Sequence, residues 1–361
     1  MNETAFEKVL ESMGARGADA LVVSDPYSID YLSGIMIHSG ERMCVLAVRR
    51  DGQRGIFTSK LFYRDDPPLP MTFYDDTEDP SVYLAAFIMG ASRVAVDRSL
   101  PAAFLIPLEQ KLPGASFVLA DGIVEAIRQV KSKEELEKMR EASRINDLAM
   151  ERLIPLVGRG LTENELGEEL LKIYLSLGAD GFSFSPITAY GKNSADPHHD
   201  NDGSTGRRGD SVVLDIGCIK DGYCSDMTRT VFIGEADETA KKIYYIVKEA
   251  NLRGIEAVRP GARFCDIDRA AREYIEKAGY GEYFTHRLGH SIGRQVHEWG
   301  DVSSANEETV KEGMVFSIEP GIYLPGKVGV RIEDLVEVTS GGCRVLNGFT
   351  RELITVEEGN E

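Results

Sequence analysis

The sequence has few of the features that would assign it to a secreted or membrane protein. Its five cysteines are an odd number without C-x-x-C spacing, so they predict reduced thiols rather than a disulfide framework. No apolar run approaches the length that spans a bilayer, and the N-terminal segment MNETAFEKVLESMGARG is amphipathic without an apolar signal core. We therefore expect a cytoplasmic protein without a membrane-spanning segment.

Positive charge is also scarce. The 41 lysines and arginines stand against 59 acidic residues, which gives a net charge of −18 and a pI near 4.9. Such an acidic chain is not expected to bind nucleic acid or an anionic membrane surface. A length of 361 residues with 42% hydrophobic content is typical of a globular protein with two domains.

The predicted elements divide the chain into residues 1–125 and 126–361. In the first part helices and strands alternate, which favours a smaller N-terminal α/β domain. The expected helices lie at about 4–15, 26–33, 80–89 and 101–111, and the expected strands at 20–24, 43–49, 54–58, 93–97 and 116–120. Ser132 followed by Glu135 is a capping-box pattern, which predicts the start of a long helix beyond the boundary.

The rest of the chain favours an α+β domain. Thr162 with Glu165 repeats the capping-box pattern before a second helix. Asp237 or Thr239 is a candidate N-cap of a third helix, and Asp266 is a candidate N-cap of a fourth. Strand-like blocks separate these helices, as expected for helices that back a curved, mostly antiparallel sheet.

Five acidic and histidine residues stand within strand-like blocks of the C-terminal half: Asp215, Asp226, His290, Glu319 and Glu333. An unpaired carboxylate in an apolar strand is unfavourable, and four carboxylates in one small volume repel each other. Two divalent cations between them would remove that repulsion. Any one of these residues alone would more often be structural, but together they predict a two-metal site, which usually activates water for hydrolysis.

The turn between two of these blocks predicts how their strands pair. Asp221-Gly222 is a strong hairpin signal. If these two residues form the loop, Asp215 faces Thr228. Because side chains two apart on a strand share a face, Asp215 and Asp226 would be diagonal neighbours roughly 7–8 Å apart. A three-residue loop would break this parity.

The same reasoning applies to Glu319 and Glu333. If residues 325–327 form the loop between their blocks, the two glutamates oppose each other directly. Opposed glutamates destabilise a bare hairpin, and a metal in the gap would offset that effect. Pro320-Gly321 inside the first strand leaves open a bulge that would shift the pairing.

Five motifs occur in an order that resembles the pita-bread metallopeptidases: GKNSADPHH, LDIGCIKDGYCSDMTRT, HRLGHSIGRQVHE, EGMVFSIEPGIY and GVRIEDL. Within that family the chain most resembles the prolidases, which are Xaa-Pro dipeptidases, with aminopeptidase P a close relative. The resemblance implies a C-terminal pita-bread (creatinase/aminopeptidase-like) catalytic domain after a prolidase-like N-terminal domain. It also implies hydrolysis of Xaa-Pro dipeptides by a hydroxide between two metal ions.

The resemblance implies a role for each of the five residues. Asp226 and Glu333 would bridge the ions, Asp215 would serve one ion, and His290 with Glu319 would serve the other. Glu319 would also act as the general acid and base. The resemblance implies manganese or cobalt, with manganese the first expectation. An oxygen-rich ligand set with one imidazole fits manganese and leaves zinc or iron possible.

Three histidines and an arginine complete the predicted site. The resemblance implies that His198, rather than its neighbour His199, assists proton transfer and contacts substrate, and that His297 contacts the scissile region. His286 either contacts substrate or packs in the core. Arg331 lies two residues before a predicted ligand, so it could orient a ligand carboxylate or bind the substrate carboxylate.

Alternatives stay open at this point. An aminopeptidase P would act on longer peptides. A pita-bread binding protein would have lost catalysis, but the presence of all five predicted ligands speaks against it. A metal-free creatinase-type amidinohydrolase shares the fold but should lack this ligand set. The resemblance also implies a homodimer. Ser291, Arg294-Gln295 and Trp299-Gly300 depart from the usual motif, which leaves the side-chain preference at Xaa open.

Overall fold

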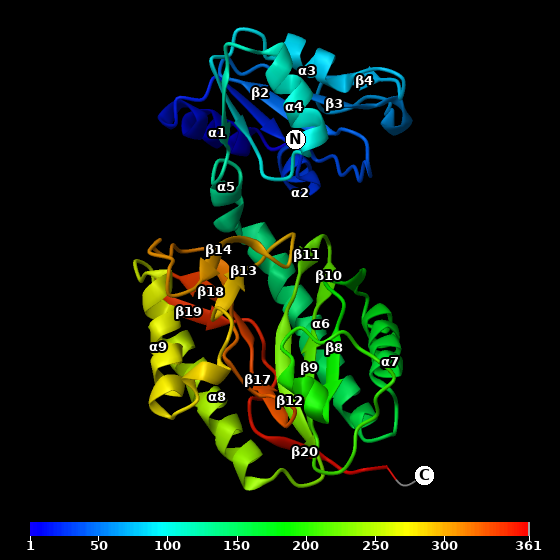
Figure 1. Ribbon diagram of the computed structural model, residues 1–361, viewed down its shortest axis with the longest axis vertical. Helices are drawn as coiled ribbons and strands as arrows, with labels where there is room; N and C mark the ends of the chain where they lie inside the picture. Colours follow the sequence, from blue (N-terminus) through cyan, green and yellow to red (C-terminus); the bar gives the residue numbers. More distant parts are fainter. Residues whose placement is uncertain (360–361) are drawn as a thin grey trace. The chain divides into compact units, whose positions relative to one another are not determined.

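The computed structural model describes residues 1–359, and the chain divides into two compact units, Met1–Arg128 and Gln129–Glu361. Figure 1 labels the elements along the chain. No helix among the described residues is long and apolar enough to cross a membrane. The five cysteines are free thiols, and all but Cys343 are buried.

The N-terminal unit contains a six-stranded mixed sheet in the order β4-β3-β2-β1-β5-β6. Its strands are β1 (Ala20–Val23), β2 (Val45–Arg49), β3 (Arg54–Ser59), β4 (Met71–Tyr74), β5 (Arg93–Val96) and β6 (Ser116–Leu119). Its helices are α1 (Glu3–Ala15), α2 (Pro26–Ser33), α3 (Pro80–Phe87), α4 (Ala102–Lys111) and α5 (Glu125–Gln129). The predicted elements are confirmed to within a few residues, whereas strand β4 and the short helix α5 were missed.

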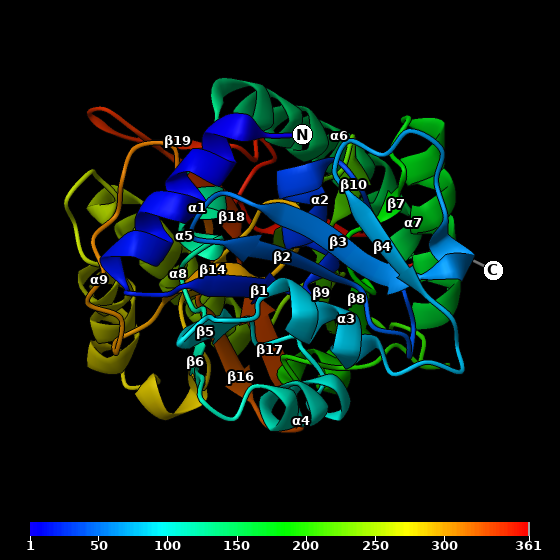
Figure 2. The same cartoon turned by 90° about the horizontal axis from the view of Figure 1, so that it is seen from above.

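Alternation along the strands gives this sheet a core on each face. Leu21 packs with α1 and α2 on one face, whereas Val22 packs with α3 and α4 on the other. Figure 2 shows these helix pairs on either side of strands β1 to β3. Strand β4 was missed because it is a short, half-buried edge strand that follows a proline-rich segment, Pro67 to Pro70.

Four long helices belong to the C-terminal unit: α6 (Lys133–Val157), α7 (Glu163–Ser176), α8 (Glu238–Ala257) and α9 (Phe264–Lys277). Both predicted capping boxes are confirmed, and Asp237 rather than Thr239 caps α8. The predicted fourth helix is present as α9, but its predicted N-cap was wrong. The helix begins two residues before Asp266, whose carboxylate instead binds the guanidinium of Arg263 at 2.8 Å, so it does not cap the helix.

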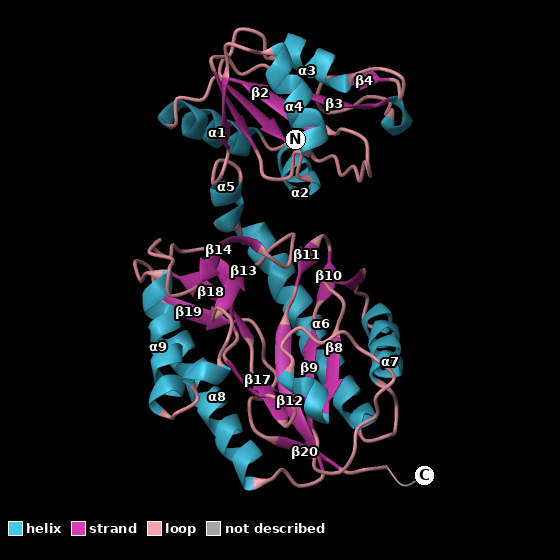
Figure 3. Cartoon of the chain, viewed as in Figure 1, coloured by secondary structure: helices cyan, strands magenta, loops and turns pink. Residues whose placement is uncertain are grey.

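The strands of this unit form four small sheets in the orders β20-β12-β9-β8, β14-β13-β15-β18-β19, β11-β10-β7 and β16-β17. Their bounds are β7 (Gly181–Phe182), β8 (Ile187–Tyr190), β9 (Ser211–Ile216), β10 (Cys218–Lys220), β11 (Tyr223–Cys224), β12 (Met227–Ile233), β13 (Gly289–Ser291), β14 (Glu298–Val302), β15 (Val315–Ile318), β16 (Gly321–Leu324), β17 (Val328–Arg331), β18 (Asp334–Thr339), β19 (Gly342–Val345) and β20 (Ile354–Val356). One core packs α6 and α7 against β8, β9 and β12, and another packs α8 and α9 against β15 to β18. Figure 3 shows α6 and α7 on the side of β8 and β9, and α8 and α9 on the side of β17 and β18. The predicted α+β pita-bread fold is confirmed.

The hairpin that carries Asp215 and Asp226 has the predicted register. Asp221 and Gly222 both have positive φ angles, of 50° and 76°, which is the backbone of a two-residue type I′ turn. Beyond the turn, Asp215 pairs with Thr228. The two carboxylates therefore start from the same face of the hairpin, as predicted.

The hairpin that carries Glu319 and Glu333 also keeps its predicted register. Leu324 pairs with Val328 next to the loop, and Ile318 pairs with Asp334 beyond the glutamates, so no residue is inserted between these points. Both strands are nevertheless interrupted at the glutamates, because Pro320 has no N–H to donate to the ladder. The glutamates therefore lie in a gap between two stretches of hairpin rather than inside a continuous one.

Candidate metal centre

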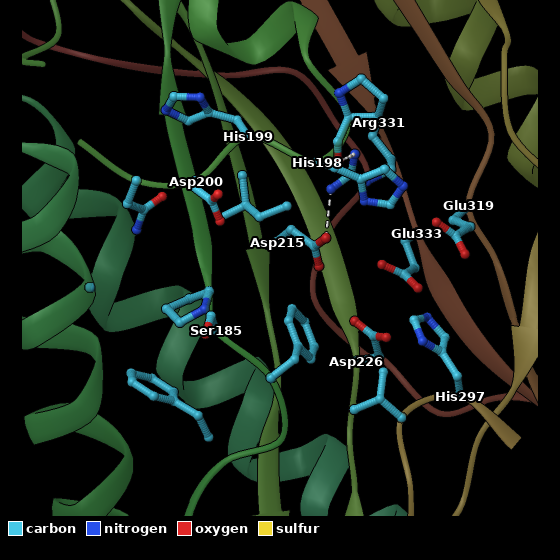
Figure 4. A pocket seen from close by; sticks show the side chains of 18 of the residues that line it. Ser185, His198, His199, Asp200, Asp215, Asp226, His297, Glu319, Arg331 and Glu333 are labelled. Atoms are coloured by element: carbon cyan, nitrogen blue, oxygen red, sulfur yellow. Dashed lines mark hydrogen bonds and ion pairs between the residues drawn. The ribbon is translucent and has the colours of Figure 1, made fainter. Parts of the chain in front are cut away.

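All the predicted site residues line one cavity of about 1080 Å³ in the C-terminal unit, and Figure 4 shows most of them. They are Asp215, Asp226, His290, Glu319, Glu333, His198, His286, His297 and Arg331. Two separate sheets supply them: Asp215 lies on β9 and Asp226 directly before β12, whereas His290 lies on β13. The interrupted hairpin completes the set, because its gap places both glutamates at the same cavity.

Three of the predicted ligands form a tight group. One ligand atom from each of Asp226, His290 and Glu333 lies within 4.8 Å of the others. The Nε2 atom of His290 is 3.5 Å from Asp226 Oδ2 and 3.5 Å from Glu319 Oε1, so the imidazole nitrogen points at carboxylates on both sides. This spacing leaves room for a cation between the ligand atoms.

Several carboxylate oxygens in this group lack a partner. Asp215 Oδ1, Asp226 Oδ1 and Glu333 Oε1 are shielded from solvent and have no hydrogen-bond donor within the described part of the chain. Unsatisfied buried carboxylate oxygens are strongly unfavourable unless they bind a cation. Oxygen donors with one imidazole are also the ligands that hard and borderline divalent metals take in proteins. The residues present therefore fit divalent metal ions.

The crowding of negative charge raises the pKa values of these acids. Burial, then the neighbouring Glu333 and Asp215, raises the pKa of Asp226 well above its usual range. Burial, then Glu319 and Asp215, does the same to Glu333. Burial also raises the pKa of Glu319 to about 7, although Arg331 opposes the shift. Without cations the cluster therefore holds protons, and metal binding must displace them.

The raised pKa values predict how the stability of the metal-free protein changes with pH. Above pH 6.5, Asp226, Glu319 and Glu333 hold more protons in the native state than in the unfolded chain, so the free energy of unfolding falls as pH rises. Burial lowers the pKa values of His286 and His290 to about 3, which has the opposite effect but only below about pH 6.5.

We therefore expect the thermal unfolding midpoint of chelator-treated protein to fall as pH is raised from about 6.5 to 8. A Glu319→Gln variant should show a smaller fall, because glutamine does not titrate. A midpoint that stays level or rises over this interval in the unsubstituted protein would contradict the raised pKa values.

Arg331 holds one of the predicted ligands in place. Its Nη2 atom donates to Asp215 Oδ2 at 2.5 Å, which leaves Oδ1 directed elsewhere. Its Nη1 atom donates to the carbonyl of Pro197 and to the hydroxyl of Tyr323, and its Nε atom donates to Thr228 Oγ1. The guanidinium is buried, so these contacts favour the prediction that it orients a ligand carboxylate.

Three hydroxyl groups that the sequence analysis missed also support the cluster. Thr228 Oγ1 donates to Glu333 Oε2 at 2.7 Å. Ser317 Oγ accepts the backbone N–H of His290 and donates to Glu319 Oε1. The same period of two that related the carboxylates could have found Thr228 and Ser317, since each lies two residues from a predicted ligand. Tyr323, four residues after Glu319, had no such signal.

The histidines differ in their surroundings. His286 Nδ1 donates to the carbonyl of Arg287, and its Nε2 accepts from Tyr323, whose hydroxyl accepts from Arg331. The ring centroids of His297 and His290 lie 4.3 Å apart in an edge-to-face arrangement. Burial lowers the pKa of His297. The rings of His286 and His297 both line the cavity and can approach a bound ligand.

His198 and His199 lie on opposite sides of their loop. In Figure 4 the ring of His198 lies on the side of Glu319 and Glu333, whereas the ring of His199 lies away from them. His199 Nε2 instead contacts the buried carboxylate of Glu163 at 2.6 Å. The arrangement agrees with the prediction that His198, and not His199, is available to the reaction.

Comparison with known proteins extends over nearly the whole chain. An uncharacterized peptidase of Staphylococcus aureus is 34% identical over 359 residues, which cover 96% of this chain and all of the relative. A crystal structure of a dipeptidase from Pyrococcus horikoshii matches with a TM-score of 0.91 and 39% identity, over 98% of this chain and 100% of that one. The prolidase from Pyrococcus horikoshii matches with a TM-score of 0.90 and 32% identity over the same shares.

Two family descriptions match adjoining parts of the sequence. Residues 6–130 match the Creatinase/Prolidase N-terminal domain. Residues 137–340, more than half of the chain, match Metallopeptidase family M24, and they contain every ligand of the candidate metal centre. This chain therefore belongs to metallopeptidase family M24, with a Creatinase/Prolidase N-terminal domain followed by a pita-bread catalytic domain.

Proposed function

We propose that this peptidase hydrolyses Xaa-Pro dipeptides at a centre of two divalent cations. The observation that carries the proposal is the group of four carboxylates and one imidazole around a single cavity, with three carboxylate oxygens left without partners. Solved structures described as a dipeptidase and a prolidase resemble the chain along almost its full length, which supports this substrate class.

The five clustered residues would hold the ions. Asp226 and Glu333 would bridge both, Asp215 would complete one site, and His290 with Glu319 would complete the other. When bound, two divalent cations supply Lewis acidity to the scissile carbonyl and to water. Manganese is our preferred metal, because oxygen donors outnumber the single imidazole.

Glu319 is the proposed proton carrier. A carboxylate beside the attacking water can take a proton from that water and pass it to the prolyl nitrogen that leaves. That nitrogen needs a proton because it leaves as a neutral amine and not as an amide anion. His198 and His297, whose rings line the cavity, would steady the substrate carbonyl as it becomes tetrahedral.

The other two predicted contacts are assigned from their hydrogen bonds. We assign Arg331 chiefly to holding Asp215, because its guanidinium already donates to four acceptors. His286 is kept neutral by burial, and Tyr323 fixes its ring at the cavity wall, where it would contact the proline ring of the substrate.

The His198→Ala variant tests the role of that ring. We expect kcat to fall by about 100-fold or more, the usual scale for losing a group that stabilises the tetrahedral oxyanion, with both metals still bound. Steady-state kinetics and metal analysis of the purified variant would measure this. Loss of metal would instead make His198 a metal ligand and contradict the assignment.

The proposed function is tested with Ala-Pro and Ala-Pro-Gly as substrates. Metal-stripped protein, with and without added Mn²⁺, is assayed for release of proline or Pro-Gly. Manganese-dependent cleavage of the dipeptide, with little cleavage of the tripeptide, is the expected result. No cleavage of either peptide with Mn²⁺, Co²⁺, Zn²⁺ or Fe²⁺ would overturn the proposal.

An Xaa-Pro aminopeptidase is the second candidate, and the cavity size favours testing it. A volume of about 1080 Å³ lies at the upper end of small-molecule sites, so it leaves room beyond a dipeptide. The X-Pro aminopeptidase from Thermotoga maritima also matches, with a TM-score of 0.85 and 29% identity over 97% of this chain and 99% of that one. Faster cleavage of Ala-Pro-Gly than of Ala-Pro would favour this candidate. A cytoplasmic location and a homodimer stay predictions.

A further inference from the structure

Glu163 is a fully buried carboxylate outside the metal centre. It is the first residue of α7 and has 0% of its surface exposed. Its Oε1 atom accepts from the backbone N–H of Tyr190 and from Asn193 Nδ2, both at 2.9 Å. Its Oε2 atom accepts from the backbone N–H of Asp202 at 2.9 Å and from His199 Nε2 at 2.6 Å. Both oxygens of this buried carboxylate therefore have all their partners within the protein.

Three of these donors, Asn193, His199 and Asp202, belong to residues 191–204, which we name the His198 loop, and Tyr190 directly precedes it. The backbone of Glu163 adds three more bonds: its N–H donates to the carbonyl of Ser204, and its carbonyl accepts from Thr188 Oγ1 at 2.8 Å and from Asn201 Nδ2 at 3.4 Å. A single residue of α7 therefore holds the loop at several points. His198 lies between those points, one residue from His199.

The other side of the His198 loop is held by the strand that carries Arg331. The N–H of Gly329 donates to Ser194 Oγ at 2.8 Å, and a Cβ atom at this glycine would lie 1.7 Å from the carbonyl oxygen of Ser194. Arg331 reaches the loop carbonyl of Pro197, the residue before His198. The loop is thus held between α7 on one side and β17 on the other.

Glu163, His199 and Asp202 also lie close enough together to share a cation. Each carboxylate oxygen of Glu163 already accepts two hydrogen bonds, however. These bonds hold the His198 loop against α7. The carboxylate therefore needs no ion.

We propose that Glu163 is a positioning residue for catalysis, because it fixes the loop that presents His198 to the substrate. This inference rests on the proposed function for the catalytic role of His198, but the anchoring of the loop can be measured separately. Histidines that act on a reacting group must be held to within a fraction of an ångström, and a shift of about 1 Å can reduce turnover by about 100-fold.

The first test is Glu163→Gln, which keeps the side-chain volume but replaces one acceptor oxygen with an amide donor. That amide would face two donors, so the loop loses part of its anchor. We expect kcat to fall by about 10- to 100-fold, KM to change by less than about 3-fold, and metal content to stay the same. Glu165→Gln is the matched control, because Glu165 lies on the same turn of α7 but bonds only to Thr162, and it should keep wild-type kinetics.

A double-mutant cycle separates positioning from general damage. In a His198→Ala background, Glu163→Gln should lower kcat by less than about 2-fold, because the ring that it positions is gone. An equal loss in the wild-type and His198→Ala backgrounds would overturn the proposal. If Glu163→Gln does not fold, His199→Phe takes its place, since it removes only one of the four bonds and keeps a ring of similar size.

Limited trypsin digestion reports on the loop without any assay of activity. Lys192, Arg207 and Arg208 lie in or just after the His198 loop and are exposed. We expect cleavage at these sites to be faster in Glu163→Gln than in wild type and Glu165→Gln. Unchanged cleavage together with unchanged kcat would overturn the inference. If wild-type protein released no proline while Glu163→Gln still opened the loop, the proposed substrate would be wrong and the anchoring role would stand.

Discussion

Replacement of Asp226 by asparagine is expected to release metal and to lower kcat/KM by at least about 1,000-fold, the scale on which preorganised charge acts in active sites. Asparagine keeps the shape of the side chain, so the loss isolates the negative charge. Asp226 is buried, one of its oxygens has no partner, and the other lies 3.5 Å from His290 Nε2. Metal analysis of dialysed protein and Ala-Pro kinetics would measure both effects.

The same hairpin supplies a matched control for this variant. Asp221 is an exposed residue of the turn with a φ angle of 50°, a conformation that asparagine adopts readily. Asp221→Asn therefore makes the same chemical change five residues away, and it should keep metal and activity. If Asp226→Asn retained two metals and normal turnover, the ligand assignment would be wrong.

Glu319→Gln is expected to lower kcat by about 100- to 10,000-fold, because it removes a ligand and the proposed proton carrier together. The fall should persist at metal concentrations high enough to restore full occupancy, since added metal replaces the lost affinity but not the lost base. The rate of Ala-Pro hydrolysis across a titration of Mn²⁺ would show this plateau.

The control for Glu319 is Glu312→Gln. Glu312 is an exposed acid just before β15, and Glu319 directly follows the same strand. We expect the substitution of Glu312 to leave the rate unchanged. If excess Mn²⁺ returned Glu319→Gln to wild-type turnover, Glu319 would be a ligand only, and the proton would have to move through another group.

The relative positions of the four predicted carboxylate ligands within their hairpins could be predicted because local rules determine them. A two-residue turn at Asp221-Gly222 fixes which residues face each other, and that register persists through the breaks in the strands down to Asp215. The three-residue loop before Val328 does the same for the two glutamates. In both hairpins the pairing depends on residues near each other in sequence, so the pattern is visible in one chain.

Features that depend on distant packing could not be predicted. Glu163 reads as an ordinary acid in the first turn of a helix, and only the folded chain brings Asn193, His199 and Asp202 to it. Asp266 also reads as a helix cap, but the helix starts earlier, where the N–H groups of Phe264 and Cys265 donate to the backbone carbonyls of Glu308 and Asn306. In both cases partners that are distant in sequence decided the outcome.

The two-sheet origin of the metal centre also sets an order of events during folding. Each hairpin can form early, because its strands are neighbours in sequence. The contacts between the hairpins join residues that are far apart, such as Thr228 with Glu333 at 105 positions and Asp215 with Arg331 at 116 positions. Closing loops of that length comes late. The complete ligand set therefore exists only once the two hairpins have docked, so we expect metal to bind after folding and not to nucleate it.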